Sequence, residues 1–109
     1  MMQDREYEER VDDLFNAIED GIDEIEANID VDSSVGMLTV EFPNGSSVIL
    51  SRQIANHEVW VAAKSGGYHL AFNDDQWFCR TSNENLSTLL DRVFAEQLGK
   101  AVSSFNLSR

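Results

Sequence analysis

Carboxylates are the side chains best suited to chemistry in this sequence, and they are concentrated in its first 32 residues. That segment holds 13 Asp and Glu residues against two arginines, whereas residues 33–109 hold seven acids and six Lys and Arg residues. The formal net charge of −12 therefore lies almost entirely in one third of the chain. Such a surface attracts metal cations and basic proteins, and it repels nucleic-acid phosphates and anionic membranes.

Carboxylate oxygens are hard ligands that suit Mg²⁺, Ca²⁺, Mn²⁺ and iron. Acids three and four residues apart on a helix share one convex face, so they can hold a cation but cannot enclose it. The sequence has no EF-hand loop, no Glu-x-x-His pair of the di-iron type and no Cys/His cluster of the zinc type. We therefore expect weak and poorly selective cation binding, in which one divalent or trivalent cation can substitute for another.

A long amphipathic helix must display these acids. Apolar residues recur at steps of three and four from Tyr7 to Ile25, which predicts a helix over about residues 4–26. Its opposite face carries the following acids: Glu8, Glu9, Asp12, Asp13, Glu19, Asp20, Asp23 and Glu24.

This acidic face is costly for the helix. Acids lie four residues apart in four pairs, each of which destabilises a helix by about 0.2–0.5 kcal/mol: Glu8–Asp12, Glu9–Asp13, Glu19–Asp23 and Asp20–Glu24. Gly21 in the same helix costs up to about 1 kcal/mol more. A merely solvated helix face is the alternative, but these costs favour a functional acidic surface.

Few other residues are candidates for chemistry. His57 and His69 fall in the strand region, where a lone histidine is usually a surface or edge residue. Cys79 is a single thiol, which favours a small buried core residue over a nucleophile. The Gly66–Gly67 pair fits a hairpin turn better than a phosphate loop. No residues form a nucleophile with a base, so we predict that the protein is not an enzyme.

The length of 109 residues predicts a single domain over residues 1–109. No apolar run reaches the roughly 18 residues of a membrane span, and the polar N-terminal stretch does not have the character of a signal peptide. One cysteine cannot form an internal disulfide, so we expect a reducing compartment and a cytoplasmic location.

Short segments rich in β-forming residues fill the middle of the chain. About five strands are predicted, over residues 37–42, 48–50, 58–63, 68–72 and 76–80, with turn signals such as Pro43-Asn44-Gly45 between them. Residues 28–34 are expected to form a polar connection. A second helix should follow a cap at Ser82 or Asn83 and end at Gly99; residues 102–107 form an ambiguous tail.

This order of elements predicts an α+β fold: a two-layer α/β sandwich with two helices packed on one face of a roughly five-stranded antiparallel sheet. The other sheet face is then open to solvent or to a partner. Residues 59–62 are apolar on both faces, so Trp60 is either a core residue or, if Val59 and Val61 face the helices, an interface anchor on the open face. The residues alone slightly favour the buried indole.

Two segments resemble the signature of the bacterial frataxin family, the CyaY-type proteins. They are residues 51–53, Ser-Arg-Gln, and residues 57–69, His-Glu-Val-Trp-Val-Ala-Ala-Lys-Ser-Gly-Gly-Tyr-His. Four other features agree with this resemblance. They are the acidic first helix, the Leu38-Thr39-Val40 strand that leads into Asn44-Gly45-Ser46, the Trp77-Phe78-Cys79 strand and the leucine-rich last helix. It therefore covers essentially the whole chain in order.

The resemblance implies a frataxin-like sandwich and an adaptor or regulator of iron–sulfur cluster assembly. It implies that Fe²⁺ and Fe³⁺ bind weakly to a ridge with these ligands: Asp4, Glu8, Asp12, Glu19, Asp20, Asp23, Glu24 and Glu26. It also implies docking on a cysteine desulfurase and an iron–sulfur scaffold protein through these residues: Glu19, Asp20, Asp23, Asp30, Asp32, Arg52, Gln53 and Trp60.

The same resemblance favours Trp60 on the open face. It implies a monomer without metal and leaves an iron-driven oligomer open. Two other functions remain as alternatives. One is ferroxidase-type iron oxidation and storage, for which a shallow, solvated site offers little preorganisation. The other is an acidic interaction module unrelated to iron, in which the Trp60 strand has no role.

Overall fold

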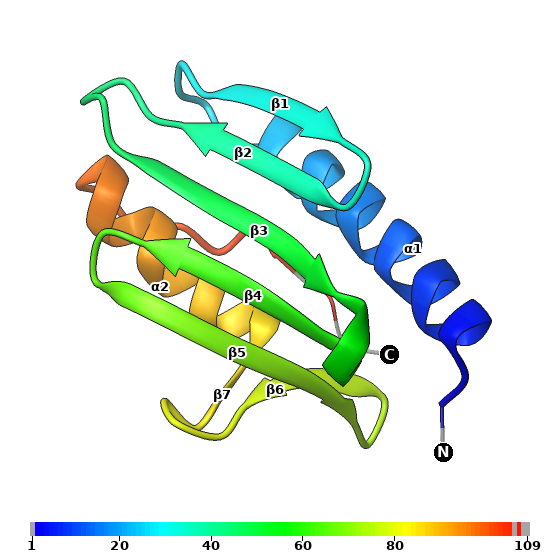
Figure 1. Ribbon diagram of the computed structural model, residues 1–109. Helices are drawn as coiled ribbons and strands as arrows, with labels where there is room; N and C mark the ends of the chain where they lie inside the picture. The colour runs from blue at the N-terminus through cyan, green and yellow to red at the C-terminus, as the bar shows by residue number, and fades with distance from the viewer. Residues whose placement is uncertain (1, 106, 108–109) are drawn as a thin grey trace.

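A seven-stranded antiparallel sheet forms one layer of the protein, and two helices cover one of its faces (Figure 1). The structure is a computed structural model that describes residues 2–105 and residue 107. The helices are α1 (Asp4–Asp23) and α2 (Leu86–Leu98), with a short 3₁₀ turn η1 (Ile54–Asn56) between strands. No helix in this described part of the chain is long and apolar enough to cross a membrane.

The strands lie side by side in their chain order. They are β1 (Asp30–Ser34), β2 (Met37–Glu41), β3 (Ser47–Gln53), β4 (Glu58–Ala63), β5 (Gly66–Asn73), β6 (Gln76–Cys79) and β7 (Glu84–Asn85). Each connection is short, as an antiparallel meander requires. The predicted two-layer sandwich is therefore confirmed, with seven strands where about five were expected.

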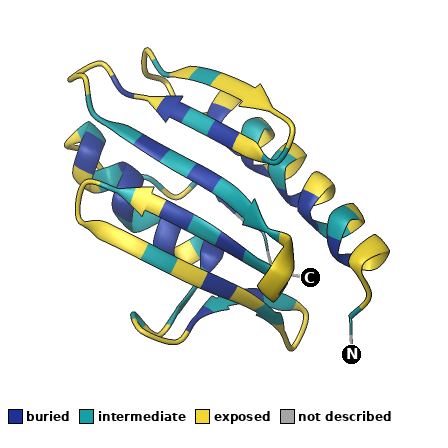
Figure 2. Ribbon diagram, in the orientation of Figure 1, coloured by how far each residue is buried: buried dark blue, intermediate teal, exposed yellow. Residues whose placement is uncertain are grey.

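The strand register sorts the side chains onto two faces, because direct partners in a ladder share a face. Leu50 pairs with Val61, and both are buried beneath the helices. The alternate row on the open face runs from Met37 through Ser51 and Trp60 to His69. Figure 2 shows this alternation as buried bands separated by bands of intermediate burial along β3 and β4.

The two additional strands carry little apolar signal. In β1 only Val31 is half-buried and the other side chains are exposed, so backbone pairing with β2 forms the strand without a hydrophobic alternation. β7 has two residues and immediately precedes α2.

The cap of α2 is Asn85, whose Oδ1 accepts a hydrogen bond from the Thr88 backbone N–H at 2.9 Å. The predicted caps at Ser82 or Asn83 were therefore wrong, because strand pairing continues to Asn85.

α1 ends at Asp23 rather than near residue 26, and Glu24 is its C-cap. Gly21 is buried in this last turn, where the C-terminal segment crosses the helix. Phe105 packs there and contacts the Phe94 ring edge-on at 4.9 Å between centroids. The glycine thus has a packing role, so its helix cost is not a sign of an acidic functional surface. Gly99 ends α2 in the left-handed conformation, as predicted.

Candidate metal and partner surfaces

The acids at the start of α1 are paired with basic side chains within the protein. The Glu6 carboxylate accepts from Arg10 at 3.0 Å, and Glu9 lies 3.8 Å from Arg5. Both pairs span one helical turn and stabilise the helix by a few tenths of a kcal/mol. They leave these two carboxylates partly neutralised.

Two longer-range pairs join α1 to the end of β3 and the η1 corner. Asp4 Oδ1 lies 2.7 Å from Nε2 of His57, and Glu8 forms an ion pair with the half-buried Arg52 guanidinium. Arg52 also lies under the β1–β2 turn, where a Cβ atom on Gly36 would be 2.7 Å from its Nε. The structure therefore directs Arg52 toward the helix, and two predicted metal ligands, Asp4 and Glu8, already have internal partners.

The remaining acids form a separate group, which we call the distal ridge. It consists of Asp12, Asp13, Glu19, Asp20, Asp23, Glu24 and Glu26. None of them forms an ion pair with another described residue, and Lys100 reaches only the backbone carbonyl of Glu26, at 2.8 Å. The acids in the last turn of α1 lie at the negative end of the helix dipole. That turn contains no basic residue to offset their charge.

The distal ridge borders an open hollow of about 500 Å³ between α1 and the β1–β2 turn. Asp12 and Glu19 lie on its helix wall, and Ser33 and Val35 lie on the opposite wall. No three Asp, Glu, His or Cys residues of the described chain converge as a metal cage. The geometry thus offers carboxylates to a hydrated cation or a basic side chain, and each of the predicted ligands stays a prediction.

The predicted acids of β1 do not share the helix side of the protein. Asp30 and Asp32 alternate with Val31, whose partner Val40 is buried under the helices, so both acids lie on the open sheet face. Glu41 is the direct partner of Asp30 and joins them there. Glu41 was not predicted as part of this surface, because its position opposite Asp30 depends on pairing with β1, a strand that was not predicted.

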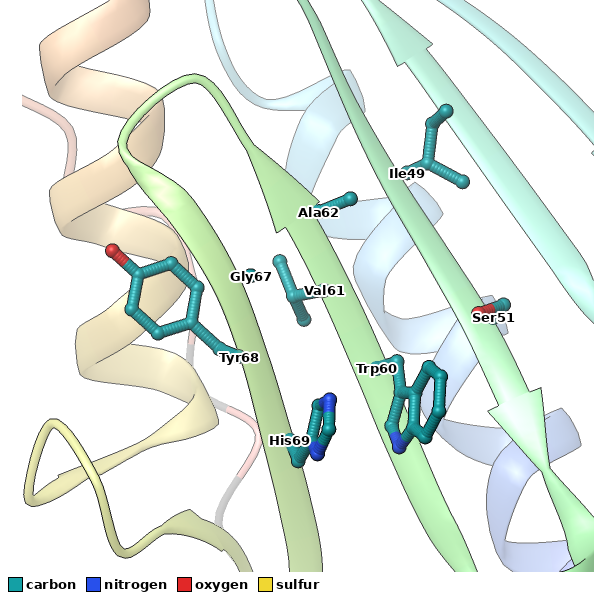
Figure 3. A pocket seen from close by; sticks show the side chains of 8 residues that line it. All are labelled: Ile49, Ser51, Trp60, Val61, Ala62, Gly67, Tyr68 and His69. Atoms are coloured by element: carbon teal, nitrogen blue, oxygen red, sulfur yellow. The ribbon is translucent and has the colours of Figure 1, made fainter.

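Trp60 lies half-buried on the open sheet face, because Val59 and Val61 on either side of it face the core. Its indole stacks on the His69 imidazole with centroids 4.2 Å apart and planes 6° from parallel. Its Nε1–H donates to Glu58 Oε1 at 2.9 Å. Figure 3 shows the two rings side by side at the edge of a hollow of about 170 Å³.

Gln53 lies at the end of β3, close to this surface. Its backbone N–H donates to the Tyr7 hydroxyl at 2.9 Å, and that hydroxyl donates to the Glu58 carbonyl at 2.6 Å. The Tyr7 ring also stacks on His57, with centroids 4.9 Å apart. Burial raises the pKa of the Tyr7 phenol above its ordinary value of 10.0, an effect that the Gln53 hydrogen bond partly offsets.

The interactions of His57, Glu58 and His69 were not predicted from the sequence. Their contacts depend on the β4–β5 register and on the approach of α1 to η1, neither of which leaves a periodic signal. A sequence signal did exist for Glu58, because residues two apart on a strand share a face. That spacing places Glu58 beside Trp60.

Comparisons with known proteins give a consistent picture. A family model described as a frataxin-like domain matches residues 1–100. The chain is 40% identical over 102 residues to the iron-sulfur cluster assembly protein CyaY of Photobacterium profundum, covering 94% of this chain and 97% of that protein. It is 42% identical over 103 residues to the protein of the same name from Stutzerimonas stutzeri, covering 93% and 94% of the two chains.

Solved structures agree with the architecture. Frataxin from Psychromonas ingrahamii superposes with a TM-score of 0.88 at 31% identity, covering 96% of this chain and all of that chain. Trimeric frataxin from Saccharomyces cerevisiae, complexed with ferrous iron, superposes with a TM-score of 0.68 at 20% identity, covering 92% and 89%. At that identity, the yeast protein supports the fold alone.

Proposed function

Because the chain belongs to the frataxin family, we propose that it acts in iron–sulfur cluster assembly as an iron-binding adaptor. Its bacterial relatives carry the name of cluster assembly proteins rather than that of an enzyme. In this role the protein binds a cysteine desulfurase and an iron–sulfur scaffold protein in the cytoplasm. It regulates their activity and carries out no bond chemistry of its own.

The observation that carries this proposal is the distal ridge. Seven carboxylates without basic partners among the described residues lie from the middle of α1 to just beyond its C-terminal end, whereas the first turns of the same helix are internally paired. Carboxylates at the negative end of a helix repel one another and the helix dipole. An arriving cation or basic protein surface relieves both repulsions, so binding is favoured there.

The distal ridge fits weak binding of Fe²⁺ and Fe³⁺. Oxygen ligands suit both ions, and a site on one helix face leaves water in several coordination positions. Asp20 and Asp23 are exposed and close enough in sequence to share one ion. Asp4 and Glu8 bind cations only in competition with His57 and Arg52, so we place the iron ligands at the distal ridge.

Partner docking uses two surfaces in this proposal. The distal ridge meets a basic patch of the desulfurase, and the open sheet face around Trp60 meets the desulfurase–scaffold assembly. Half-exposed aromatic side chains are frequent anchors of protein interfaces. Asp30, Asp32 and Gln53 lie toward the same open face or its end, which extends the contact beyond the indole.

The test is a calorimetric titration of the protein into purified cysteine desulfurase at 50 mM and 300 mM salt. Wild-type affinity should fall steeply with salt, because screening weakens contacts between exposed charges. Asp20→Lys combined with Asp23→Lys should weaken binding at least about tenfold at low salt, since it reverses two charges at the docking surface.

The matched control is Glu6→Lys combined with Glu9→Lys, which changes the net charge equally on the internally paired part of the same helix. This control should bind within about threefold of wild type. Equal loss in both double variants would indicate attraction by total charge and contradict docking at the distal ridge. Unchanged affinity in both, with folded proteins and active desulfurase, would remove the electrostatic mechanism altogether.

A further inference from the structure

The Trp60 indole is exposed to solvent on one side, yet it is held by contacts on two others. An exposed tryptophan on a sheet face ordinarily samples several rotamers. Here Glu58 engages the edge of the indole and His69 covers one ring face. Neither contact is required by the core, because all three side chains lie on the open side of the sheet.

Glu58 fixes the indole through a hydrogen bond to a carboxylate. Its Oε1 accepts from Nε1 of Trp60 at 2.9 Å, and hydrogen bonds to ionised acceptors are stronger than neutral ones. Glu58 is itself anchored, because its backbone carbonyl accepts the Tyr7 hydroxyl of α1. The acceptor therefore belongs to a part of the strand that the helix holds in place.

His69 restricts the Trp60 indole further by stacking on one of its faces. It is the direct cross-strand partner of Trp60, and the nearly parallel rings lie 4.2 Å apart. Rotation of the indole about χ1 or χ2 would lose this stack and the Glu58 hydrogen bond together. Since the indole lines the 170 Å³ hollow with Ile49 and Ala62, its orientation also sets the shape of that hollow (Figure 3).

We infer that Glu58 and His69 are positioning residues, which hold the Trp60 indole in its docking orientation before a partner arrives. The inference rests on the proposed role of Trp60 in binding the desulfurase–scaffold assembly. A partner that meets a fixed indole does not have to immobilise it, so affinity is gained without any new contact. Loss of either positioning residue should weaken binding about two- to tenfold, the usual range for ordering one side chain.

The first experiment measures the free protein by ¹⁵N NMR. The heteronuclear NOE of the Trp60 indole N–H should match that of Trp77, which is buried and serves as an internal reference. Glu58→Ala and His69→Ala should each lower the Trp60 value and leave the Trp77 value unchanged. Glu58→Gln, which keeps an acceptor, and His69→Phe, which keeps a stacking ring, should restore rigidity.

The second experiment measures affinity of the same variants for the purified desulfurase–scaffold pair, with urea unfolding as the stability control. Glu58→Ala leaves the backbone carbonyl that binds Tyr7, so the fold should be retained. Weaker binding by the two alanine variants, with recovery in the two conservative variants, supports the inference. A mobile indole in the wild type, or alanine variants that keep it rigid, would overturn it.

Two further outcomes separate this inference from the proposed function. If the variants loosen the indole but bind the partners as tightly as wild type, the positioning role is refuted. If the indole is rigid and loosened as predicted but no form binds the desulfurase–scaffold pair, positioning is upheld and the proposed partners are wrong.

Discussion

A Cβ atom on Gly21 would lie 2.9 Å from Cδ1 of Phe105, so the glycine allows the C-terminal segment to pass directly against α1. The backbone oxygen of Ser104 would be 3.2 Å away on the same side. Phe105 is buried and its backbone N–H donates to Asp91 at 3.3 Å. The C-terminal segment is therefore part of the core that holds the acidic helix in place.

Gly21→Ala should destabilise the protein by about 1 kcal/mol. Helix propensity alone predicts a gain of about 1 kcal/mol for this change, but overpacking against Phe105 costs about 1–3 kcal/mol. Urea unfolding followed by far-ultraviolet circular dichroism measures the difference. In a Phe105→Leu background, Gly21→Ala should lower the free energy of unfolding by less than it does in the wild type. A stabilised single variant would show that Phe105 does not pack there.

Tyr7→Phe should destabilise the protein by about 1–3 kcal/mol, although it removes a single oxygen. The hydroxyl satisfies both the Gln53 N–H and the Glu58 carbonyl, and buried polar groups left without partners carry that cost. Urea midpoints at pH 7 give the measurement. Tyr68→Phe is the control, since its hydroxyl forms a hydrogen bond with the exposed Ser65 side chain; an equal loss in both variants would contradict the role of the Tyr7 bridge.

The sequence predicted those parts of the fold that bury regular apolar patterns. The stripe of α1 was predicted correctly, and Cys79 proved to be a buried core residue. The residues alone favoured a buried Trp60, which was wrong, and only the family resemblance favoured the open face. β1 escaped prediction because its side chains are almost all exposed and only its backbone pairs. Its strand character arises from the neighbouring β2 and not from its own residues.

The candidate site was predictable in composition but not in charge pairing. The acids of α1 could be read from the sequence, whereas the partners of Asp4 and Glu8 come from residues 53 and 44 positions away. Such contacts depend on the packing of α1 against η1, which no local spacing encodes. The division between paired acids and the distal ridge is therefore a product of tertiary structure.

Glu84→Gln should reduce the fall in the free energy of unfolding that occurs as the pH is lowered into the acid range. Hydrogen bonds from Arg92 at 2.8 and 2.9 Å hold the pKa of Glu84 below its ordinary value of 4.5. A carboxylate with a lowered folded-state pKa stabilises the fold above 4.5, and this contribution is lost as pH falls through the folded-state pKa. Urea unfolding between pH 6 and pH 3 should thus show a shallower decline for the variant. The same slope as wild type would indicate that the pair does not persist in solution.

Asp20→Lys combined with Asp23→Lys should stabilise the isolated protein by about 0.5–1 kcal/mol while it weakens partner binding. The change removes repulsion with Glu24 and Glu19, and it places positive charge at the negative end of α1. Thermal unfolding at low salt should show a higher Tm, and the gain should shrink in 500 mM salt. A lower Tm would show that the distal ridge contributes to folding and would weaken the case for a functional surface.

Mn²⁺ should broaden the amide NMR signals of residues 19–26 at lower concentrations than those of residues 4–9. Both segments are acidic, but Asp4 and Glu8 are already paired with His57 and Arg52, so Mn²⁺ must compete with these side chains there. Arg52→Ala frees the Glu8 carboxylate and should extend broadening into residues 4–9. Arg80→Ala removes the same charge from an exposed residue and should leave the pattern as in wild type. Equal broadening of both segments in the wild type would contradict the division of the acidic helix, since it would mean that internal pairing does not reduce cation binding.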